Sequence, residues 1–337
     1  MKTLNRWKII GFVLCACVFA AIALQLNGGA LHAADLAITQ ALYAARAPAV
    51  TFCMRLITLL CAPTVLLAIC LTLMFLYRKK HYSIPIAINL MVSVSLNYSL
   101  KNVFLRERPP LMYRAVTETG YSFPSGHAMT AGAFYGFLIY IVAQSALPKR
   151  VKRWVIGALS LLIGLVGLSR VYLGVHYASD VLAGFAVSIG YLLIYATIVG
   201  LYLRAGQNEA IKPIATGKNK RLTDSFRHAF DGVAGGLKGE RNMMIHFAVM
   251  SLVTVFGFLL SISKVEWLVC VILFGLVISM ELINTAIETT VDICMPTQDA
   301  RAKLAKDTAA GAVMIVSVAA AVAGVIIFAP KLWPMLR

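Results

Sequence analysis

The chain has 337 residues, of which 60% are hydrophobic and only 13% are charged, and its formal net charge is +17. Because a soluble domain carries roughly 25% charged residues, this composition excludes an ordinary soluble protein. The sequence also lacks a basic groove pattern interleaved with aromatic residues, so the positive charge does not indicate binding to nucleic acid.

Nine apolar runs lie near the ~20 residues that a helix needs to cross a bilayer. The predicted spans cover residues 9–26, 56–77, 84–100, 128–147, 154–168, 181–203, 243–260, 265–291 and 309–328. They predict an all-α integral membrane protein. The basic start followed by small residues also fits a signal peptide, but the length of the first run favours an uncleaved anchor.

Lys and Arg residues gather in the loops on one side of these spans. If the N-terminus lies in the cytoplasm, most of the 31 basic residues fall on the cytoplasmic side. This bias follows the positive-inside rule, which sets the orientation of membrane proteins. We therefore expect a multi-pass protein of the bacterial inner (plasma) membrane, whose basic loops are attracted to anionic lipids.

Three polar patches interrupt the apolar sequence of the first two-thirds of the chain. They read KNVFLRERP (101–109), PSGH (124–127) and SRVYLGVHYASD (169–180). On the predicted topology all three lie at the outer ends of the third to sixth spans and meet at one membrane face. Charged residues are costly in a bilayer, so such patches usually mark function. Three other charges are interpreted as solvated loop charges: Arg106, Glu107 and Arg114.

The residue types in these patches suit the binding of a phosphate group. Lys101, Arg108 and Arg170 can hold its non-bridging oxygens, and arginine offers bidentate forks. Ser125 and Gly126 directly precede a predicted helix, whose free backbone N–H groups also attract an anion. No carboxylate cluster offers a metal site here, so the cations supply the electrostatic stabilisation and no cofactor is expected.

Two histidines allow phosphoryl transfer to be divided between a nucleophile and an acid. Asp180 follows His176 by one helical turn, so it can accept a hydrogen bond from one ring nitrogen and leave the other as the nucleophile. His127 has no carboxylate nearby in sequence, which suits a general acid that protonates the leaving oxygen.

Together the patterns KxxxxxxRP, PSGH and SRxxxxxHxxxD resemble the three-part signature of the type 2 phosphatidic acid phosphatase superfamily, over residues 1–203. The resemblance implies a six-helix membrane bundle and a phosphohistidine intermediate. It assigns the nucleophile to His176, the orienting carboxylate to Asp180 and the acid to His127. The residues that it assigns to phosphate binding are Lys101, Arg108, Ser125, Gly126 and Arg170.

The character of the chain changes after the sixth span. Residues 204–220 are polar, contain Gly and Pro and lack an apolar period, so they are predicted to form a cytoplasmic linker. Apolar residues then recur at helical spacing, which predicts an amphipathic helix on the cytoplasmic membrane surface. These residues are Leu222, Phe226, Phe230, Val233 and Leu237.

The eighth span carries Glu281, Asn284, Glu288 and Asp292 at spacings that place all four on one helical face. Carboxylates in an apolar helix are costly unless they pair or bind something. A path for protons or cations is one explanation, and Mg²⁺ held for a nucleotide is another. Nearby polar residues at the inner ends of the flanking spans favour the nucleotide: Glu240, Lys306 and Asp307.

The runs SFRHAFDGVAGGLKGERN, ELINTAIETTVD and AKDTAAGAVM resemble the small bacterial diacylglycerol kinase and undecaprenol kinase family, over about 221–328. The resemblance implies a trimer that uses Mg²⁺ and ATP. It makes Glu281 the base that takes the lipid hydroxyl proton and places Mg²⁺–ATP on Glu240 and Glu288. The other residues implied at the ATP site are Asn284, Lys306 and Asp307. Asp292 belongs either to the site or to the helix end, and His246 is interpreted as a packing or interfacial residue.

The sequence thus predicts a lipid phosphatase domain at 1–203, a linker at 204–220 and a three-helix lipid kinase domain at 221–337. If both domains act on undecaprenyl lipids, dephosphorylation of undecaprenyl diphosphate outside and phosphorylation of undecaprenol inside converge on undecaprenyl phosphate. Phosphatidate or phosphatidylglycerophosphate turnover with a diacylglycerol kinase is the enzyme alternative. An ion-coupled transporter is the alternative of another class, but the repeated halves common in transporters are not found.

Overall fold

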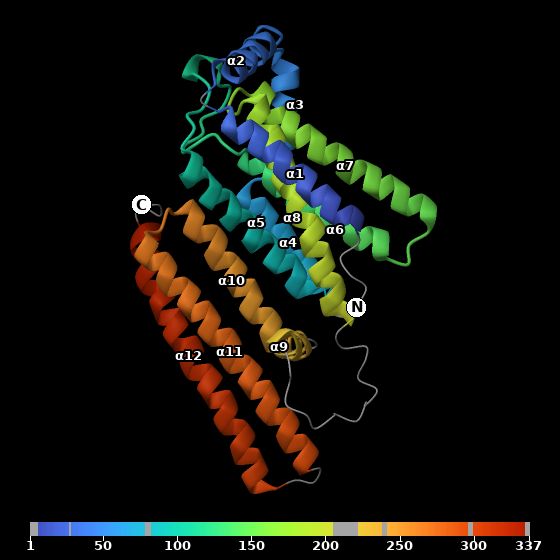
Figure 1. The fold of residues 1–337 in the computed structure, drawn as a ribbon. Coiled ribbons are helices and arrows are strands. Elements are labelled where there is room, and N and C mark those ends of the chain that lie inside the picture. Colours follow the sequence, from blue (N-terminus) through green and yellow to red (C-terminus); the bar gives the residue numbers. More distant parts are fainter. Residues whose placement is uncertain are drawn as a thin grey trace. The chain divides into compact units, whose positions relative to one another are not determined.

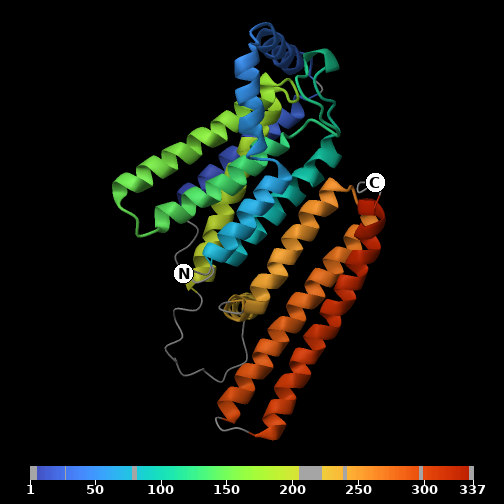
Figure 2. The same cartoon turned by 180° about the vertical axis from the view of Figure 1, so that it is seen from behind.

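A computed structural model describes residues 6–26, 28–77, 82–204, 222–237, 241–295 and 299–333. These residues form helices and connecting loops, with no strand among them. Contacts divide the chain into two compact units, each seen from opposite sides in Figures 1 and 2. Unit 1 is Met1–Thr72 with Ile86–Val199, and unit 2 is Leu73–Pro85 with Gly200–Arg337. The predicted linker, 204–220, lies outside the described residues apart from Arg204.

The helices follow one another in the order labelled in Figure 1. They are α1 (Arg6–Leu24), α2 (Gly29–Ala44), α3 (Pro48–Leu59), α4 (Pro63–Leu76), α5 (Ser83–Phe104), the 3₁₀ helix η2 (Leu111–Tyr113), α6 (Gly126–Gln144), α7 (Lys149–Tyr172), α8 (Ala178–Arg204), α9 (Leu222–Gly236), α10 (Arg241–Leu259), α11 (Lys264–Cys294) and α12 (Ala300–Leu332).

Eight helices in the described ranges are long and apolar enough to cross a membrane, and α3 with α4 adds a ninth span if the bent pair is counted as one. The predicted all-α membrane fold is therefore confirmed. The second predicted span, 56–77, is corrected, because it begins inside α3 and bends by 47° between α3 and α4. Pro63 starts α4 and has no N–H to continue α3. The carbonyl of Leu60 at the break accepts a hydrogen bond of 2.7 Å from the Tyr135 hydroxyl of α6.

The helix α2 belongs to none of the predicted spans. Figures 1 and 2 show it at one end of unit 1, beside the segment that contains η2. The ring of Tyr43 in α2 packs edge-on against that of Tyr113 in η2, with centroids 5.4 Å apart. Asp35 and Thr39 are buried, although both are polar. The α2 helix therefore presents a buried carboxylate to the loops of unit 1.

Glycines allow α6 and α8 to approach closely. A Cβ at Gly132 of α6 would lie 2.1 Å from the Ser188 hydroxyl of α8. A Cβ at Gly184 of α8 would lie 3.0 Å from the carbonyl oxygen of Ser125, the residue before α6. The backbone of Ser125 is thereby held against α8, and its N–H donates to the Asp180 carbonyl at 3.0 Å.

In unit 2, α11 and α12 form a long antiparallel hairpin (Figure 1). The α11 helix starts with a capping box between Ser263 and Glu266, and Asp299 caps the start of α12. Two ion pairs fix the register of the hairpin, Asp292 with Lys306 near the turn and Glu266 with Lys331 at 3.2 Å near the other end.

The predicted amphipathic helix is confirmed as α9, which occupies Leu222–Gly236. Its apolar side chains Phe226, Phe230 and Val233 are exposed, whereas Ala234 is buried. An exposed apolar stripe beside a charged face is typical of a helix that lies at a membrane interface.

Candidate active sites

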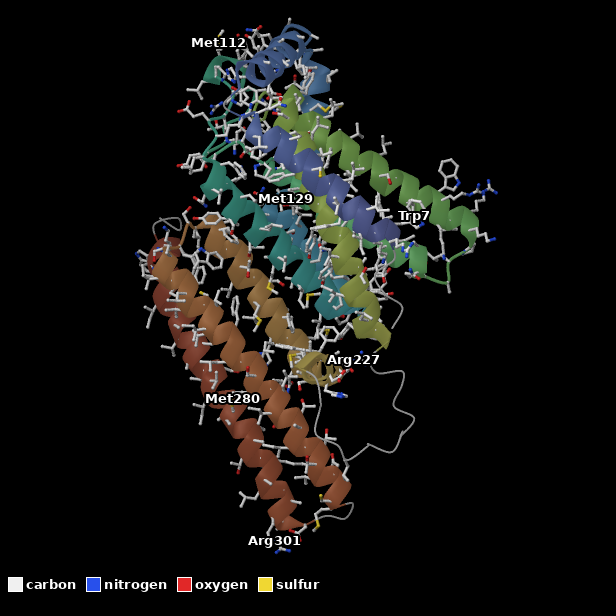
Figure 3. All side chains as sticks on the ribbon, viewed as in Figure 1. Trp7, Met112, Met129, Arg227, Met280 and Arg301 are labelled. Carbon is white, nitrogen blue, oxygen red and sulfur yellow. The ribbon has the colours of Figure 1, made fainter. Side chains whose placement is uncertain are left out.

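The phosphatase motifs meet at one end of unit 1, where the ends of four helices and their loops converge. Met129, labelled in Figure 3, marks the first turn of the α6 helix, which begins within PSGH at Gly126. The predicted site residues come from the last turn of α5 (Lys101), the loop after it (Arg108), the start of α6 (Ser125, Gly126, His127), the end of α7 (Arg170), the following turn (His176) and the first turn of α8 (Asp180).

The turn between α7 and α8 aims His176 into this cluster. Gly174 has φ +70°, and a Cβ there would lie 2.0 Å from the Tyr113 carbonyl oxygen, so only glycine fits this position. The Arg46 side chain links the η2 segment to the end of α7, because it donates to the carbonyls of Tyr113 at 2.5 Å and Tyr172 at 2.8 Å. The backbone N–H of His176 donates to the Arg170 carbonyl at 3.3 Å.

The hydrogen bonds of His176 fix its tautomer. Its Nε2 lies 3.0 Å from Nη1 of Arg108, and a guanidinium can only donate, so Nε2 carries no proton and its lone pair accepts this hydrogen bond. Nδ1 then holds the proton and faces the Ser122 hydroxyl at 3.3 Å. Ser122 in turn donates to Oδ2 of Asp180 at 2.5 Å. The sequence predicted a direct bond from His176 to Asp180, but these two groups are 3.6 Å apart and Ser122 bridges them.

The surroundings of His176 keep its imidazole neutral. Its side chain is only 1% exposed. Burial, followed by the charges of Lys101, Arg108 and Arg170, lowers its pKa well below the usual range. A neutral ring leaves Nε2 unprotonated at neutral pH, as a nucleophile requires. His127, at the start of α6, is close enough to His176, Arg170 and Lys101 to interact with them electrostatically.

Two buried polar atoms in this cluster have no hydrogen-bond partner among the described residues, Oγ of Ser125 and Nε of Arg170. Such atoms are rare in proteins and point to a ligand that completes them. A Cβ at Gly126 would lie 2.9 Å from Oδ1 of Asn97 and 3.8 Å from Cε of Lys101, so the start of α6 sits directly beside the lysine. The donors fit a phosphate.

A carboxylate already lies between the cations. Glu118 pairs with Arg170 and lies 3.8 Å from Arg108. Arg108 also donates to the carbonyls of Thr119 at 2.9 Å and Gly120 at 3.0 Å, and Lys101 donates to the carbonyl of Tyr121. A phosphate that binds the three cations must therefore replace the contacts of segment 118–121. Glu118 had no predicted role, because its partner Arg170 lies 52 residues away along the chain.

Arg106 corrects a prediction. It was interpreted as a solvated loop charge, but its side chain is 8% exposed and it donates to Asp180 at 2.5 Å and Asp35 at 2.8 Å. Its guanidinium lies 4.3 Å from the ring centroid of Tyr177. Burial alone would lower the pKa of Arg106, but the two carboxylates raise it above its ordinary value. The prediction failed because Asp35 comes from α2, for which no role was predicted.

The two neighbouring charges behave differently. Glu107 is exposed, as predicted, whereas Arg114 is half-buried and donates to the Pro109 carbonyl at 2.7 Å. A cavity of about 580 Å³ opens beside the cluster and is lined by Arg106, Arg108 and Arg114. The cavity wall thus carries three guanidinium groups together with the carboxylate of Glu107.

We expect Arg106→Met to destabilise unit 1 by on the order of 3 kcal/mol, because it leaves Asp35 and Asp180 buried without their shared counter-charge. Phosphate release should fall with it, since Asp180 loses a fixed position. Glu107→Met is the matched control and should change stability by less than ~0.5 kcal/mol. Thermal unfolding of both detergent-solubilised variants checks the prediction, and equal melting temperatures would contradict it.

The second cluster lies on α11 in unit 2. Figure 3 labels Met280, the residue before Glu281, and Arg301 near the turn between α11 and α12. Glu281 is 1% exposed, and its Oε2 lies 4.0 Å from Nε2 of His246 on α10. One turn further, the Asn284 side chain donates to Glu288 at 3.0 Å. His246 was predicted to be a packing or interfacial residue, and the structure places it beside the buried carboxylate.

The remaining predicted ATP-site residues lie nearer the turn of the hairpin. Lys306 pairs with Asp292 across the hairpin, and Asp307 is exposed. The Asp292–Lys306 register places both α12 residues about one helical turn beyond Glu288. Glu240, predicted to bind Mg²⁺–ATP, lies outside the described residues.

The donor set on α11 fits a metal shared with a nucleotide. The described ranges contain no group of three His, Cys, Asp or Glu side chains that could enclose a metal ion. Mg²⁺, however, is usually held by one or two carboxylates, with phosphate oxygens and water completing its coordination. Glu288 offers a carboxylate, and the amide oxygen of Asn284 is buried with no hydrogen-bond partner in the described part of the chain.

Comparisons with known proteins match the parts of the chain that carry the two clusters to two different families. Residues 82–203 match the PAP2 superfamily, and residues 227–328 match the prokaryotic diacylglycerol kinase family. Undecaprenol kinase of Bacillus subtilis (strain 168) is 43% identical over 112 residues, which are 33% of this chain and 91% of that protein. Phosphatidylglycerophosphatase B of the same organism is 36% identical over 185 residues, 52% of this chain and 88% of that protein.

A solved structure agrees with the first match. The crystal structure of a transmembrane PAP2-type phosphatidylglycerolphosphate phosphatase from Bacillus subtilis superposes with a TM-score of 0.52 at 32% sequence identity. The superposition covers 56% of this chain and 96% of that one. The chain therefore belongs to both families, as a multi-pass membrane enzyme that joins a PAP2 lipid phosphatase to a lipid kinase of the prokaryotic diacylglycerol kinase family.

Proposed function

We propose that this enzyme recycles an undecaprenyl carrier lipid in the bacterial inner membrane. The phosphatase domain converts undecaprenyl diphosphate to undecaprenyl phosphate, and the kinase domain makes the same product from undecaprenol. The observation that carries the proposal is the 43% identity of the kinase domain to an undecaprenol kinase, over 91% of that protein. Because the kinase domain is fused to a phosphatase domain, one protein then makes undecaprenyl phosphate by two routes.

The fusion itself argues against a shared phosphatidate–diacylglycerol pair. A kinase and a phosphatase that acted on that pair would reverse each other and consume ATP without net product. The positive-inside pattern supports two separate compartments, with the phosphatase motifs outside and the kinase carboxylates at the cytoplasmic side, where ATP is available. Dephosphorylation outside and phosphorylation inside then supply one carrier from two pools.

In the phosphatase domain, Nε2 of His176 attacks the terminal phosphorus while Lys101, Arg108 and Arg170 neutralise the phosphate oxygens. Ser125 and the backbone N–H of Gly126 complete the cradle. The P–O bond to the lipid breaks as an N–P bond forms, and His127 protonates the leaving oxygen. Ser122 and Asp180 stabilise the charge that develops on the imidazole. Water then attacks phosphorus, its proton passes to His127, and the N–P bond breaks to release phosphate.

In the kinase domain, Glu281 takes the proton of the lipid hydroxyl, and the lipid oxygen attacks the γ-phosphorus of ATP. The P–O bond between the β- and γ-phosphates breaks, and ADP leaves. Glu288 and Glu240 hold Mg²⁺–ATP, which supplies the phosphoryl group, and Asn284, Lys306 and Asp307 line its site. The buried position of Glu281 excludes water, so the proton comes from the lipid. We propose that the domain assembles as a homotrimer.

One observation favours a second substrate for the phosphatase domain. Phosphatidylglycerophosphatase B is 36% identical to this chain over 185 residues, and its name specifies a glycerolipid head group. The three cations in the site recognise a terminal phosphate in either substrate, so the lipid behind the phosphate has to be found by assay.

We expect purified wild-type enzyme to release phosphate from undecaprenyl diphosphate faster than from phosphatidylglycerophosphate or phosphatidate. With ATP and Mg²⁺ it should phosphorylate undecaprenol in preference to diacylglycerol, because the kinase domain is the part most similar to an undecaprenol kinase. Initial rates on this panel, in mixed micelles at equal mole fractions, give the comparison. Rapid phosphorylation of diacylglycerol with no activity on undecaprenol would refute the carrier-lipid assignment.

A further inference from the structure

An apolar cavity in unit 2 ends beside the buried carboxylate of the kinase cluster. Its volume is about 780 Å³, and its walls come from α10, α11 and α12. Among the described residues that line it, only His246 and Ser317 have side chains with nitrogen or oxygen. His246 is also the residue that lies 4.0 Å from Glu281. The cavity and the predicted base are therefore neighbours.

The register of the hairpin places Ser317 at the same level. Asp292 faces Lys306, and Glu266 faces Lys331, so in this antiparallel pair Ser317 lies opposite Glu281. The Ser317 hydroxyl is buried and has no hydrogen-bond partner in the described part of the chain. An orphaned hydroxyl, a histidine and a carboxylate thus meet at one end of the cavity, where a polar ligand group can bind.

The rest of the cavity runs away from this polar end. On α11 its lining residues precede Glu281, from Cys270 to Val277, and on α12 they follow Ser317, from Ala320 to Leu332. Because α11 and α12 are antiparallel, the residues before Glu281 and the residues after Ser317 lie toward the same end of the hairpin. The distance from Ser317 to Leu332 is about 22 Å along α12, at ~1.5 Å per residue. The cavity is thus a long apolar channel with one polar end.

We propose that this cavity holds the hydrocarbon chain of the lipid alcohol, with the hydroxyl at Ser317 and His246, within reach of Glu281. The proposal rests on the kinase function and adds where the substrate binds. A long-chain alcohol matches the distribution of polarity, because it too has one polar end. Small residues on α12, such as Ala320 and Gly324, leave room for the chain, and a Cβ at Gly324 would contact nothing within 4 Å.

Filling the cavity from α12 tests the proposal in the full-length protein. Ala320→Phe and Gly324→Leu narrow the cavity, whereas Ala319→Phe is a matched control, because Ala319 is exposed and does not line it. All variants carry His176→Ala, so that only the kinase domain is active in the assay. Phosphorylation of undecaprenol and of the short alcohol farnesol is measured over a range of mole fractions.

We expect Ala320→Phe and Gly324→Leu to raise KM for undecaprenol by about tenfold, the loss expected when roughly two methylene groups are no longer buried. Their kcat should stay within ~2-fold, and KM for farnesol should change less. Ala319→Phe should match the parent. Equal KM values for all variants would overturn the proposal. A changed oligomeric state in Ala320→Phe and Gly324→Leu, with equal losses for both alcohols, would overturn it in favour of a second copy of the chain packed on α12.

The same comparison separates this proposal from the carrier-lipid assignment. If the parent phosphorylates undecaprenol but cavity filling has no effect, the binding site is wrong and the function stands. If the parent phosphorylates diacylglycerol alone, the carrier-lipid assignment is wrong. The binding site is then tested with diacylglycerols: the two cavity-filling variants should raise KM for long-chain diacylglycerol more than KM for short-chain diacylglycerol.

Discussion

His176→Ala is expected to abolish phosphate release, with a fall in kcat of about 10⁴-fold or more, and to leave the kinase activity unchanged. The magnitude follows from the loss of a covalent nucleophile that no neighbouring group can replace. Nε2 of His176 is unprotonated, because it accepts a hydrogen bond from Arg108 and the proton stays on Nδ1. The remaining cations still bind the lipid phosphate, so binding persists without turnover.

Trapping the intermediate distinguishes this role from a structural one. Wild-type protein quenched during turnover of ³²P-labelled substrate should carry label, and His176→Ala should carry none. His127→Ala should lose on the order of 10²–10⁴-fold in rate, as expected for a general acid, but less on a substrate whose leaving group needs no proton. Label on the His176→Ala protein would show that another residue is the nucleophile.

The kinase activity of His176→Ala serves as the internal control for folding. The two clusters lie in separate compact units, so removing one nucleophile should not disturb Glu281. Loss of both activities from a variant that remains folded would contradict the assignment of two independent sites.

Those parts of this architecture that depend on local pattern could be predicted from the sequence. Apolar runs of span length gave the helices, and the break near Pro63 had a local signal that the prediction did not use, because a proline disfavours helix in the residue before it. The phosphatase motifs could be grouped because four predicted span ends had to lie at one membrane face. Spacing alone also placed Asn284 one turn from Glu288, where they hydrogen bond.

The residues that the sequence could not reveal act across long distances in the chain. Ser122 bridges His176 and Asp180 from a loop 54 residues before the histidine. Asp35 contacts Ser179 across 144 residues and Arg106 across 71, from a helix that had no predicted role. No periodicity connects such positions, and a polar residue in a loop is usually solvated. Their burial is a property of tertiary packing alone.

The same limit explains the interpretation of His246. On α10 it is one polar residue in an apolar helix, which commonly means packing or an interface. Its neighbour Glu281 is 35 positions away on another helix, and only the packing of α10 on α11 brings the two side chains to 4.0 Å. A histidine in a membrane span therefore indicates a possible carboxylate partner at the same depth on a neighbouring helix.

Glu281→Gln is expected to reduce ATP-dependent lipid phosphorylation by 10²–10⁴-fold, the usual contribution of a general base. The amide has nearly the same shape as the carboxylate but cannot accept the proton of the lipid hydroxyl. Nucleotide binding should persist, because the groups that we propose for Mg²⁺–ATP lie further along α11. Phosphate release should stay at the wild-type level, since its residues lie in the other unit.

Glu266→Gln is the matched control, with the same substitution on the same helix. Glu266 completes the capping box at the start of α11, and glutamine can also fill that role. Its ion pair with Lys331 is solvent-screened, so its loss has little effect on stability. Activity of this variant should therefore equal that of the wild type.

Binding of a fluorescent nucleotide separates the roles of the two carboxylates on α11. Glu288→Gln should weaken nucleotide binding in the presence of Mg²⁺, because Mg²⁺ loses a carboxylate ligand. Glu281→Gln should bind nucleotide as the wild type does and fail in the transfer step. If Glu281→Gln instead lost nucleotide binding while keeping its turnover at saturating ATP, Glu281 would be a nucleotide ligand, and the base would have to be sought elsewhere. His246 would then be the first candidate, since it lines the cavity and lies beside Glu281.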